Sequence, residues 1–225
     1  MRRTSGCACG AARLLRGLEW AAAACDQPEL VRRQAEQRLY RPEWLEHEGE
    51  RWAVAGLAAD GMPFTGFLYA GLMIDDSGAP KVIEYNVRFG DPETQVLIPR
   101  LKTPLATLLY KAATDSLDDA VLEWRDDSAV TVVLAAPGYP DAPQVNGVIT
   151  NIPKIADTKI FHAGTLQSGE NLLSTGGRVM TVTGIGSDLT QARDLAYRAI
   201  SQIELPGSFY RSDIALNASV AEKGN

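Results

Sequence analysis

The sequence predicts a mixed α/β protein, in which an antiparallel hairpin and helices are followed by a small α+β domain. Three patterns support this fold class. Two β-prone runs flank a turn-forming segment between residues 64 and 88. A helix-start signal follows at Asp91, and a second set of β-prone runs precedes an amphipathic helix over residues 189–203. A chain of 225 residues with 45% hydrophobic side chains can bury a core in one or two domains.

The predicted hairpin pairs residues 64–75 with residues 81–88 across the segment DDSGAP, whose residue types favour a turn. Successive side chains of a strand point to opposite faces, so Glu84, Asn86 and Arg88 should share one face. That face groups a carboxylate, a carboxamide and a guanidinium. The other face carries apolar side chains, which we expect to line a core: Ile83, Tyr85 and Val87.

The segment after the hairpin has the signature of a helix start. Asp91 can cap free backbone amides, Pro92 suits the first helical position, and Glu93 falls in the first turn. The helix should run towards Ile98 and break near Pro99, because proline lacks the amide hydrogen needed in a helix interior. A second helix is predicted over residues 105–114.

An acidic, polar stretch separates this block from a second one. The second block alternates β-prone runs with loops rich in Gly and Pro, and its helix has apolar residues at the spacing of a core-facing face. The predicted elements are strands at residues 129–136, 148–152, 158–163 and 178–185, and a helix at residues 189–203 capped by Asp188. Residues 215–225 are small and polar, which predicts a frayed tail.

Residues 1–52 differ in composition from the rest. They contain nine arginines, no lysine, all three cysteines and three of the four tryptophans. Helices can be drawn over residues 11–24 and 29–40, but neither shows a clean 3.6-residue stripe. An N-terminal regulatory segment is one interpretation. A shifted reading frame or misplaced start fits the composition better, and the upstream gene sequence would distinguish the two.

Composition excludes several classes of protein. A net charge of −6 and a pI near 5.0 disfavour a nucleic-acid partner, which needs a basic surface. No apolar run is long enough for a membrane span and no secretory signal is present, so we expect a cytoplasmic protein. The cysteines show no spacing typical of a disulfide framework or zinc site. There is also no phosphate-loop motif, and neither His47 nor His162 lies near a nucleophile motif.

Glu84 and Asn86 are the main candidates for chemistry. Their oxygens are hard ligands of the kind that Mg²⁺ takes, usually with phosphates and water in its other positions. Their two-residue spacing along a strand would direct both at one ion. The alternative, for these two residues alone, is a solvated strand face.

A wider pattern surrounds these residues. TGFLYAGLMID at residues 65–75 and IEYNVRFGDPETQ at residues 83–95 strongly resemble the glycinamide ribonucleotide synthetase family, which are ATP-grasp ligases of de novo purine synthesis. The run RFGDPE is distinctive of that family. The resemblance continues through AVTVVLAAPGYP, STGGRVMTVTGIG and GSFYRSDIA, and covers residues 53–215, which correspond to the C-terminal part of the family's enzymes.

The resemblance implies ATP-dependent ligation of glycine to 5-phosphoribosylamine through an acyl phosphate, with Mg²⁺ or Mn²⁺ as the metal. It implies that Glu84 and Asn86 bind the metal and that Arg88 neutralises phosphate or acyl-phosphate charge. A structural salt bridge is the alternative role for Arg88, and helix capping is that of Asp91. The weaker candidates for substrate or phosphate binding are Asp91, Glu93 and Arg178.

The resemblance also divides the chain. Residues 53–117 imply the C-terminal part of an ATP-grasp core, 118–215 a small α+β domain and 216–225 a tail, while 1–52 have no assignment. The family's N-terminal and nucleotide-clamping subdomains are not recognisable, so we expect little ligase activity from this chain alone. A partner chain could supply the N-terminal half. The alternatives are a noncatalytic remnant that binds a metal nucleotide, and a different ATP-grasp carboxylate–amine ligase.

Overall fold

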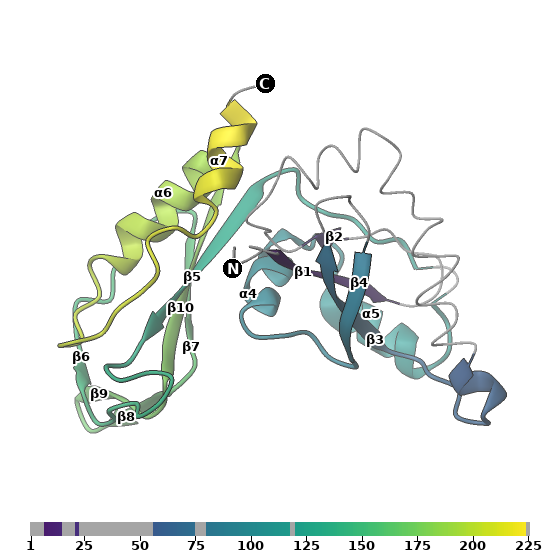
Figure 1. Ribbon diagram of the computed structural model, residues 1–225, viewed down its shortest axis with the longest axis horizontal. Coiled ribbons are helices and arrows are strands. Elements are labelled where there is room, and N and C mark those ends of the chain that lie inside the picture. The colour runs from purple at the N-terminus through teal and green to yellow at the C-terminus, as the bar shows by residue number, and fades with distance from the viewer. Residues whose placement is uncertain (1–6, 15–20, 23–55, 75–79, 118–119, 224–225) are drawn as a thin grey trace, which may run out of the picture. The chain divides into compact units, whose positions relative to one another are not determined.

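The computed structural model describes residues 7–14, 21–22, 56–74, 80–117 and 120–223. The chain divides into two compact units. The hairpin unit contains the described residues up to Gly90 together with Leu101–Trp124, and the C-terminal unit contains Asp91–Arg100 and the described residues from Arg125 onward. Antiparallel sheets and helices in these units confirm the predicted α/β class (Figure 1). Among the described residues, no helix has the length and apolar character that a membrane crossing requires.

The hairpin unit is built on an antiparallel sheet with strand order β2-β1-β3-β4. Its strands are β1 (Cys7–Leu14), β2 (Ala21–Ala22), β3 (Phe67–Ile74) and β4 (Pro80–Asn86). Pairing of β3 with β4 confirms the predicted hairpin. The predicted turn between them lies outside the described residues, apart from Pro80.

β1 corrects the expectation for the N-terminal segment. A helix over residues 11–24 is wrong, because β1 pairs along the whole of β3, from Cys7 opposite Ile74 to Leu14 opposite Phe67. The segment has no apolar stripe that would stabilise a helix. Pairing with β3 gives its backbone amides and carbonyls their hydrogen-bond partners instead. The second helix drawn from the sequence, residues 29–40, lies outside the described residues.

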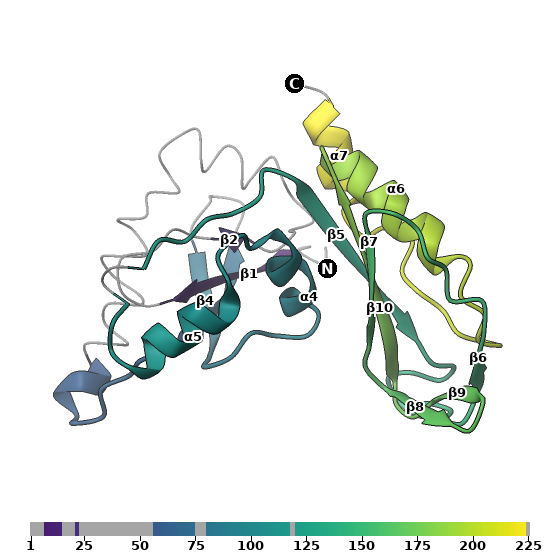
Figure 2. The ribbon, with the colours of Figure 1, turned by 180° about the vertical axis from the view of Figure 1, so that it is seen from behind.

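The apolar face of β4 is exposed, so the prediction that it lines a core is wrong. Ile83, Tyr85 and Val87 are 56%, 39% and 66% exposed. An irregularity at Ile83 interrupts the pairing of β4 with β3, and the described residues of the hairpin unit leave these side chains open to solvent. The buried cluster of this unit lies elsewhere: Leu108 of α5 (Leu105–Ala113) packs with Leu117 and with Phe67 at the start of β3. α5 confirms the second predicted helix (Figure 2).

The C-terminal unit contains two antiparallel sheets, and the four strands that the sequence predicted for this block are all present in them. The larger has the order β5-β10-β7, with β5 (Ser128–Ala135), β10 (Arg178–Gly186) and β7 (Thr158–His162). The smaller has the order β6-β9-β8, with β6 (Val148–Ile149), β9 (Asn171–Ser174) and β8 (Thr165–Ser168). The hairpin of β8 and β9 was not predicted from the sequence.

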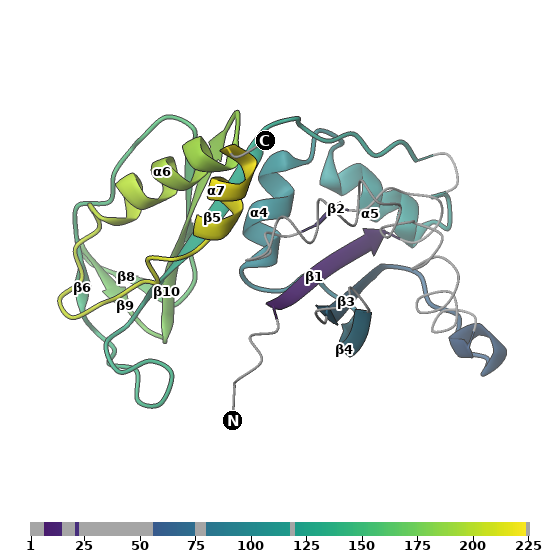
Figure 3. The same cartoon turned by 45° about the horizontal axis from the view of Figure 1, so that its top comes forward.

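α6 (Leu189–Ile200) packs along one face of the larger sheet (Figure 3). Its start confirms the predicted cap, because the Asp188 carboxylate accepts from the Gln191 amide at 2.7 Å. A Cβ on Gly184 would collide with the Ala192 carbonyl, so glycine allows the helix to approach β10 closely. The core of this face is made of aliphatic side chains, most of them small or β-branched: Val130, Val132, Leu134, Met180, Val182, Ala192, Ala196, Ala199 and Ile200.

The expected frayed tail is instead a helix, α7 (Leu216–Lys223), so that expectation is wrong. Ala218 and Ser219 are buried, at 2% and 6% exposure. The Glu222 carboxylate accepts from the Leu189 amide at 2.7 Å, which places a negative charge at the N-terminus of α6. α7 is therefore ordered by its contact with α6, which composition alone does not reveal.

α4 (Glu93–Arg100) begins one residue later than predicted, after a cis Asp91–Pro92 peptide bond. The helix ends at Arg100, which confirms the predicted break near Pro99, although Pro99 itself is still the penultimate residue of the helix. Proline removes the amide that would bond the Gln95 carbonyl. The Thr183 hydroxyl donates to that carbonyl across 3.0 Å, so a tertiary contact replaces the missing helical one.

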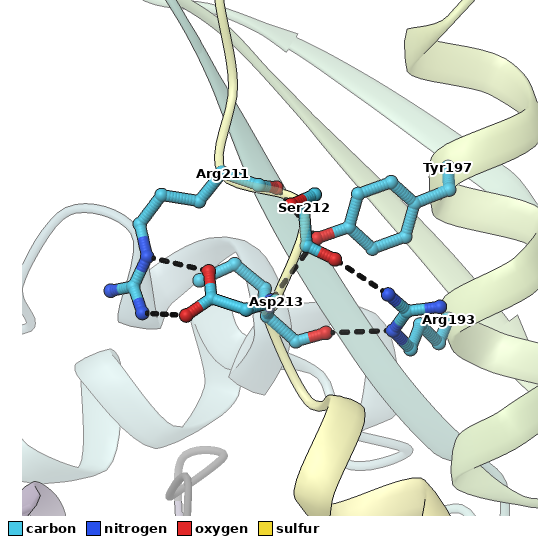
Figure 4. Close-up of polar contacts among 6 residues, drawn as sticks. Arg193, Tyr197, Arg211, Ser212 and Asp213 are labelled. Atoms are coloured by element: carbon cyan, nitrogen blue, oxygen red, sulfur yellow. Dashed lines mark hydrogen bonds and ion pairs between the residues drawn. The ribbon is translucent and has the colours of Figure 1, made fainter.

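A polar network fixes the segment that precedes α7 (Figure 4). From α6, Arg193 donates to the Ser212 carbonyl at 2.7 Å and the Tyr197 hydroxyl donates to the Arg211 carbonyl at 2.6 Å. Arg211 also forms a bidentate pair with Asp213, at 2.9 and 2.6 Å. Burial raises the pKa of Tyr197, and hydrogen bonding to Arg211 lowers the pKa of Asp213.

Candidate metal and phosphate site

β4 places the two candidate metal ligands together on one face. The Asn86 Nδ2 donates a hydrogen bond to Glu84 Oε1 at 2.9 Å, which confirms the shared face expected from strand alternation. Glu84 is exposed and Asn86 is half-buried. Because the amide nitrogen of Asn86 faces the carboxylate, its Oδ1 remains the atom suited to a cation. The pair therefore offers hard oxygens from two side chains on one accessible strand face.

Glycines occupy the neighbouring positions across the sheet beside Glu84. Gly71 of β3 pairs with Glu84, and Gly10 of β1 pairs with Gly71. Two positions in this row across the sheet therefore lack a side chain. A row of glycines permits close approach of a ligand to the backbone, as a nucleotide phosphate would require next to its metal.

The donor set fits magnesium or manganese with an incomplete protein shell. Among the described residues, no three His, Cys, Asp or Glu side chains gather into a site that would hold an ion by themselves. Glu84 and Asn86 supply two side chains, so the remaining positions would be filled by phosphate and water, which is the usual arrangement for Mg²⁺ bound with a nucleotide.

Arg88 lies two residues beyond the end of β4, so strand alternation no longer determines its direction. Its Nη1 lies 3.5 Å from the carbonyl of Phe89, and its side chain is exposed. The Phe89 ring packs against Phe67, with the ring centroids 4.2 Å apart. This aromatic contact fixes the turn that follows the strand, while the Arg88 guanidinium stays at the surface and accessible to an anion.

Asp91 and Glu93, the acidic residues of the run RFGDPETQ, belong to the C-terminal unit; the turn that contains them is called the acidic turn below. The Asp91 carboxylate accepts from Gln95 Nε2 at 2.6 Å and lies 3.5 Å from Arg178 Nε. Arg178 Nη1 also donates to the Asp91 carbonyl at 2.7 Å. The structure therefore brings Asp91 and Arg178 together, whereas Glu93 lies half-buried in the first turn of α4.

Sequence reasoning assigned no role to Gln95 or Thr183, which complete this arrangement. A signal was present, because Pro99 follows Gln95 by four residues and leaves the Gln95 carbonyl without its helical donor. A hydroxyl or amide from another element is the expected replacement. Which element supplies it depends on tertiary structure, and the sequence alone does not contain that information.

The antiparallel sheets and helices of the described residues have the fold of an ATP-grasp protein. The structure of phosphoribosylamine–glycine ligase from Thermotoga maritima is similar to this chain with a TM-score of 0.68 and 28% identity, over 94% of this chain and 56% of that one. The biotin carboxylase domain of the Hydrogenobacter thermophilus 2-oxoglutarate carboxylase shares the fold, with a TM-score of 0.52 and 17% identity over 76% of this chain and 38% of that one.

The chain belongs to the phosphoribosylglycinamide synthetase family. Residues 46–94 match the model of its ATP-grasp (A) domain, and residues 129–217 match the model of its C domain. Curated relatives named phosphoribosylamine–glycine ligase are 49% identical over 76% of this chain in Agrobacterium fabrum and 52% identical over 72% in Streptomyces coelicolor. The resemblance inferred from IEYNVRFGDPETQ is thus confirmed.

The match covers only part of the family's length. This chain spans 40% of the Agrobacterium fabrum and Streptomyces coelicolor relatives. The matched models include the Glu84–Asn86 strand and the C-terminal unit, but the greater part of each relative has no counterpart in the aligned region. Activity and substrates of the full-length relatives therefore enter below as proposals.

Proposed function

We propose that this chain forms the metal- and phosphate-binding end of a phosphoribosylamine–glycine ligase, joined to its C-terminal domain. The observation that supports this most directly is the Asn86–Glu84 hydrogen bond, which places the two candidate ligand side chains next to each other beside Gly71. Relatives with that name are 49–52% identical over the matched region. ATP would be the co-substrate, and glycine and 5-phosphoribosylamine the other substrates.

Each candidate residue has a role set by its chemistry. Glu84 and Asn86 would hold Mg²⁺ or Mn²⁺, which supplies charge neutralisation and orientation of the phosphates when bound. Arg88 would neutralise charge on the transferred phosphoryl group or the acyl phosphate. Asp91 and Glu93 would orient the substrates, and Arg178 would contact a phosphate or hold Asp91. A cytoplasmic location remains a prediction.

The proposed reaction has two displacements. A carboxylate oxygen of glycine attacks the γ-phosphorus of ATP, and the bond to the ADP oxygen breaks. The amine of 5-phosphoribosylamine then attacks the carbonyl carbon of glycyl phosphate, inorganic phosphate leaves with the bridging oxygen, and the amine loses a proton. No side chain of the protein becomes covalently modified, so its contribution is positioning and charge stabilisation.

The chain alone should have little ligase activity, because positioning of all three substrates needs more of the family's structure than 40% of its length. We propose that a separate polypeptide with the N-terminal part of the family enzyme would complete the site. This part would supply the remaining contacts to ATP, glycine and 5-phosphoribosylamine.

The test is reconstitution. The purified chain is mixed with the portion of the Agrobacterium fabrum enzyme that precedes the matched region, together with Mg²⁺, ATP, glycine and 5-phosphoribosylamine generated in situ. We expect ligated product and ADP in the mixture but not from either polypeptide alone. Ordinary turnover by this chain alone would contradict the expectation that it has little ligase activity by itself. Absence of turnover in a mixture whose two polypeptides associate would contradict the ligase proposal.

Glu84→Ala tests the metal assignment in the same mixture. Loss of a metal ligand should lower turnover by about 100-fold or more, since the ion supplies several kcal/mol of charge stabilisation. Glu170→Ala is the matched control, because Glu170 is exposed at the turn between β8 and β9 and has no proposed role. Equal effects of the two substitutions would remove Glu84 from the metal site.

A noncatalytic metal–nucleotide binder is the second candidate, favoured by the partial coverage of the relatives. Titration calorimetry of the chain with Mg-ATP distinguishes it, because this function requires binding that Glu84→Ala weakens without any ligation. A different ATP-grasp ligase would instead hydrolyse ATP with an acid other than glycine in the reconstituted mixture.

A further inference from the structure

The RFGDPETQ motif is divided between the two compact units. Its first part, up to Gly90, belongs to the hairpin unit that contains Glu84 and Asn86, and the part from Asp91 onward belongs to the C-terminal unit. The metal-ligand strand and the acidic turn that follows it in sequence are therefore held by different sets of contacts. The contacts that hold the acidic turn come from β5 and β10.

The first anchor is the Thr183 hydroxyl. It donates to the Gln95 carbonyl at 3.0 Å, and Thr183 is 0% exposed. Pro99 removes the helical donor to this same carbonyl, which would otherwise be a partly buried acceptor without its intrahelical bond. Thr131 lies beside this contact, with its hydroxyl oxygen 2.9 Å from that of Thr183. Thr183 of β10 thus supplies the hydrogen bond that Pro99 of α4 cannot supply.

The second anchor is Arg178, at the start of β10. It donates from Nη1 to the Asp91 carbonyl at 2.7 Å, and its Nε lies 3.5 Å from the Asp91 carboxylate. The same carboxylate accepts from Gln95 Nε2 at 2.6 Å. One carboxylate is therefore oriented from both sides, by an arginine of β10 and by a glutamine of α4. The two anchors lie at the two ends of one short segment, Asp91 and Gln95.

We propose that Thr183 and Arg178 are positioning residues for the acidic turn of the RFGDPETQ motif. They fix residues 91–95 to the C-terminal sheet, and through Asp91 they set the direction of the carboxylates that would orient the substrates. Pro99 makes this anchoring obligatory, because α4 has no amide of its own for the Gln95 carbonyl. The catalytic meaning of this positioning rests on the proposed ligase function, whereas the anchoring itself does not.

A double-mutant cycle on the full chain tests the first anchor, with hydrogen exchange of the α4 amides as the measurement. Thr183→Val keeps the shape of the side chain and removes the donor, so exchange should become about tenfold faster. Thr183→Ser keeps the donor and should stay within about twofold of the natural chain. Pro99→Ala restores an amide to the Gln95 carbonyl, so Thr183→Val in that background should change exchange by less than about twofold.

Two further variants separate anchoring from general destabilisation. Thr131→Val removes the neighbouring hydroxyl but leaves the donor to Gln95, and its effect should be the same with Pro99 and with alanine at that position. Arg178→Gln should accelerate exchange at residues 93–95 by several-fold, while Arg211→Gln, which breaks another arginine–aspartate pair of the same unit, should not. An equal effect of Thr183→Val in both backgrounds would overturn the anchoring.

The functional consequence is measured in the reconstituted mixture described above. Thr183→Val and Arg178→Gln should each lower kcat by about tenfold, and Thr183→Ser should restore it, because misplacement of a substrate-orienting group lowers turnover. Unchanged kcat with altered exchange would limit both residues to a structural role and overturn the positioning proposal. If the mixture has no activity while the exchange cycle behaves as expected, the ligase proposal fails and the anchoring of α4 stands.

Discussion

The two compact units differ in how far the apolar side chains of their strands are exposed to solvent. In the C-terminal unit, the residues of β10 from Val179 to Thr183 are at most 1% exposed, so both faces of that strand are covered. In the hairpin unit, Ile83 of β4 and Val87, which directly follows β4, are 56% and 66% exposed. The strand that carries the metal-ligand candidates is thus the less protected one.

The difference in burial indicates that the C-terminal unit contributes most to the stability of the fold, whereas β4 carries the candidate binding residues. The C-terminal unit contains a continuous core between α6 and the sheet of β5 and β10. The described part of the hairpin unit has a small cluster around Leu108 and Leu117. Substitutions in the C-terminal unit should therefore alter unfolding, whereas substitutions on β4 should alter ligand or partner binding with little change in the free energy of unfolding.

The largest expected effect is that of Leu134→Ala, at the centre of the C-terminal core. Leu134 is 1% exposed, and its truncation should lower the free energy of unfolding by about 2–5 kcal/mol. Urea unfolding followed by far-UV circular dichroism measures it. Leu166→Ala is the control in the same unit, because Leu166 is 56% exposed and should change stability by less than about 0.5 kcal/mol.

Leu108→Ala is the corresponding core substitution in the hairpin unit. Leu108 is 2% exposed in the hairpin unit, and its truncation should not shift the transition that Leu134→Ala shifts, if the two units unfold separately. Amide exchange resolves the two units. A shared shift of all slowly exchanging amides would contradict independent unfolding.

Tyr197→Phe should have the next largest effect. The Tyr197 hydroxyl donates to the Arg211 carbonyl at 2.6 Å and accepts from the Ile214 amide at 3.1 Å. Its removal leaves a partly buried amide without its acceptor, which should cost about 1–3 kcal/mol in thermal or urea unfolding. Tyr210→Phe is a suitable control, because it removes a hydroxyl from the neighbouring ring, 6.1 Å away between centroids.

The same tyrosine predicts an alkaline transition. Burial raises the pKa of Tyr197 above the ordinary value of 10.0, so the folded protein keeps the proton more firmly than the unfolded chain. The stabilisation is fully present below pH 10 and is lost as the pH rises through the raised pKa. Tm should therefore fall above pH 10 more steeply in the natural chain than in Tyr197→Phe. Parallel slopes would contradict this assignment.

Asp188→Ala should have a smaller effect on the same unit. The Asp188 carboxylate caps α6 through the Gln191 amide at 2.7 Å, and loss of an N-cap costs about 0.5–2 kcal/mol. Asp188→Asn keeps a capping oxygen and should retain most of the stability. If alanine and asparagine were equally destabilising in urea unfolding, the charge of Asp188 and not its cap would be responsible.

Local patterns predicted the elements whose stabilising contacts are local. The shared face of Glu84 and Asn86 follows from strand periodicity, and the Asp188 cap follows from the residue type before an amphipathic run. Residue identities also predicted the family, since IEYNVRFGDPETQ combines ligand types with a turn. These features depend on neighbours within a few positions, which a sequence displays directly.

The errors concern contacts between distant segments. α7 forms because its Ala218 packs into a core completed by α6, a contact between distant segments that the composition of the tail does not display. The apolar residues of β4 were expected to be buried because alternation predicts two faces but not what covers each face. Site assignments for Arg88, Asp91, Glu93 and Arg178 stay predictions, because their roles depend on bound substrates.

The smallest expected effect on stability is that of Val87→Ser on the exposed apolar face of β4. Val87 is 66% exposed, so its apolar surface is already in water in this chain, and the free energy of unfolding should change by less than about 0.5 kcal/mol. Leu68→Ala is the contrasting substitution in the same unit, because Leu68 is 3% exposed on the neighbouring strand and should cost about 2–5 kcal/mol. If the N-terminal part of the family enzyme covers this face, Val87→Ser should weaken the association of that part with this chain, while the unfolding of the isolated chain stays unchanged.

A large loss of stability from Val87→Ser in the isolated chain would mean that the face is already covered. The difference in apolar exposure between the two units would then be contradicted.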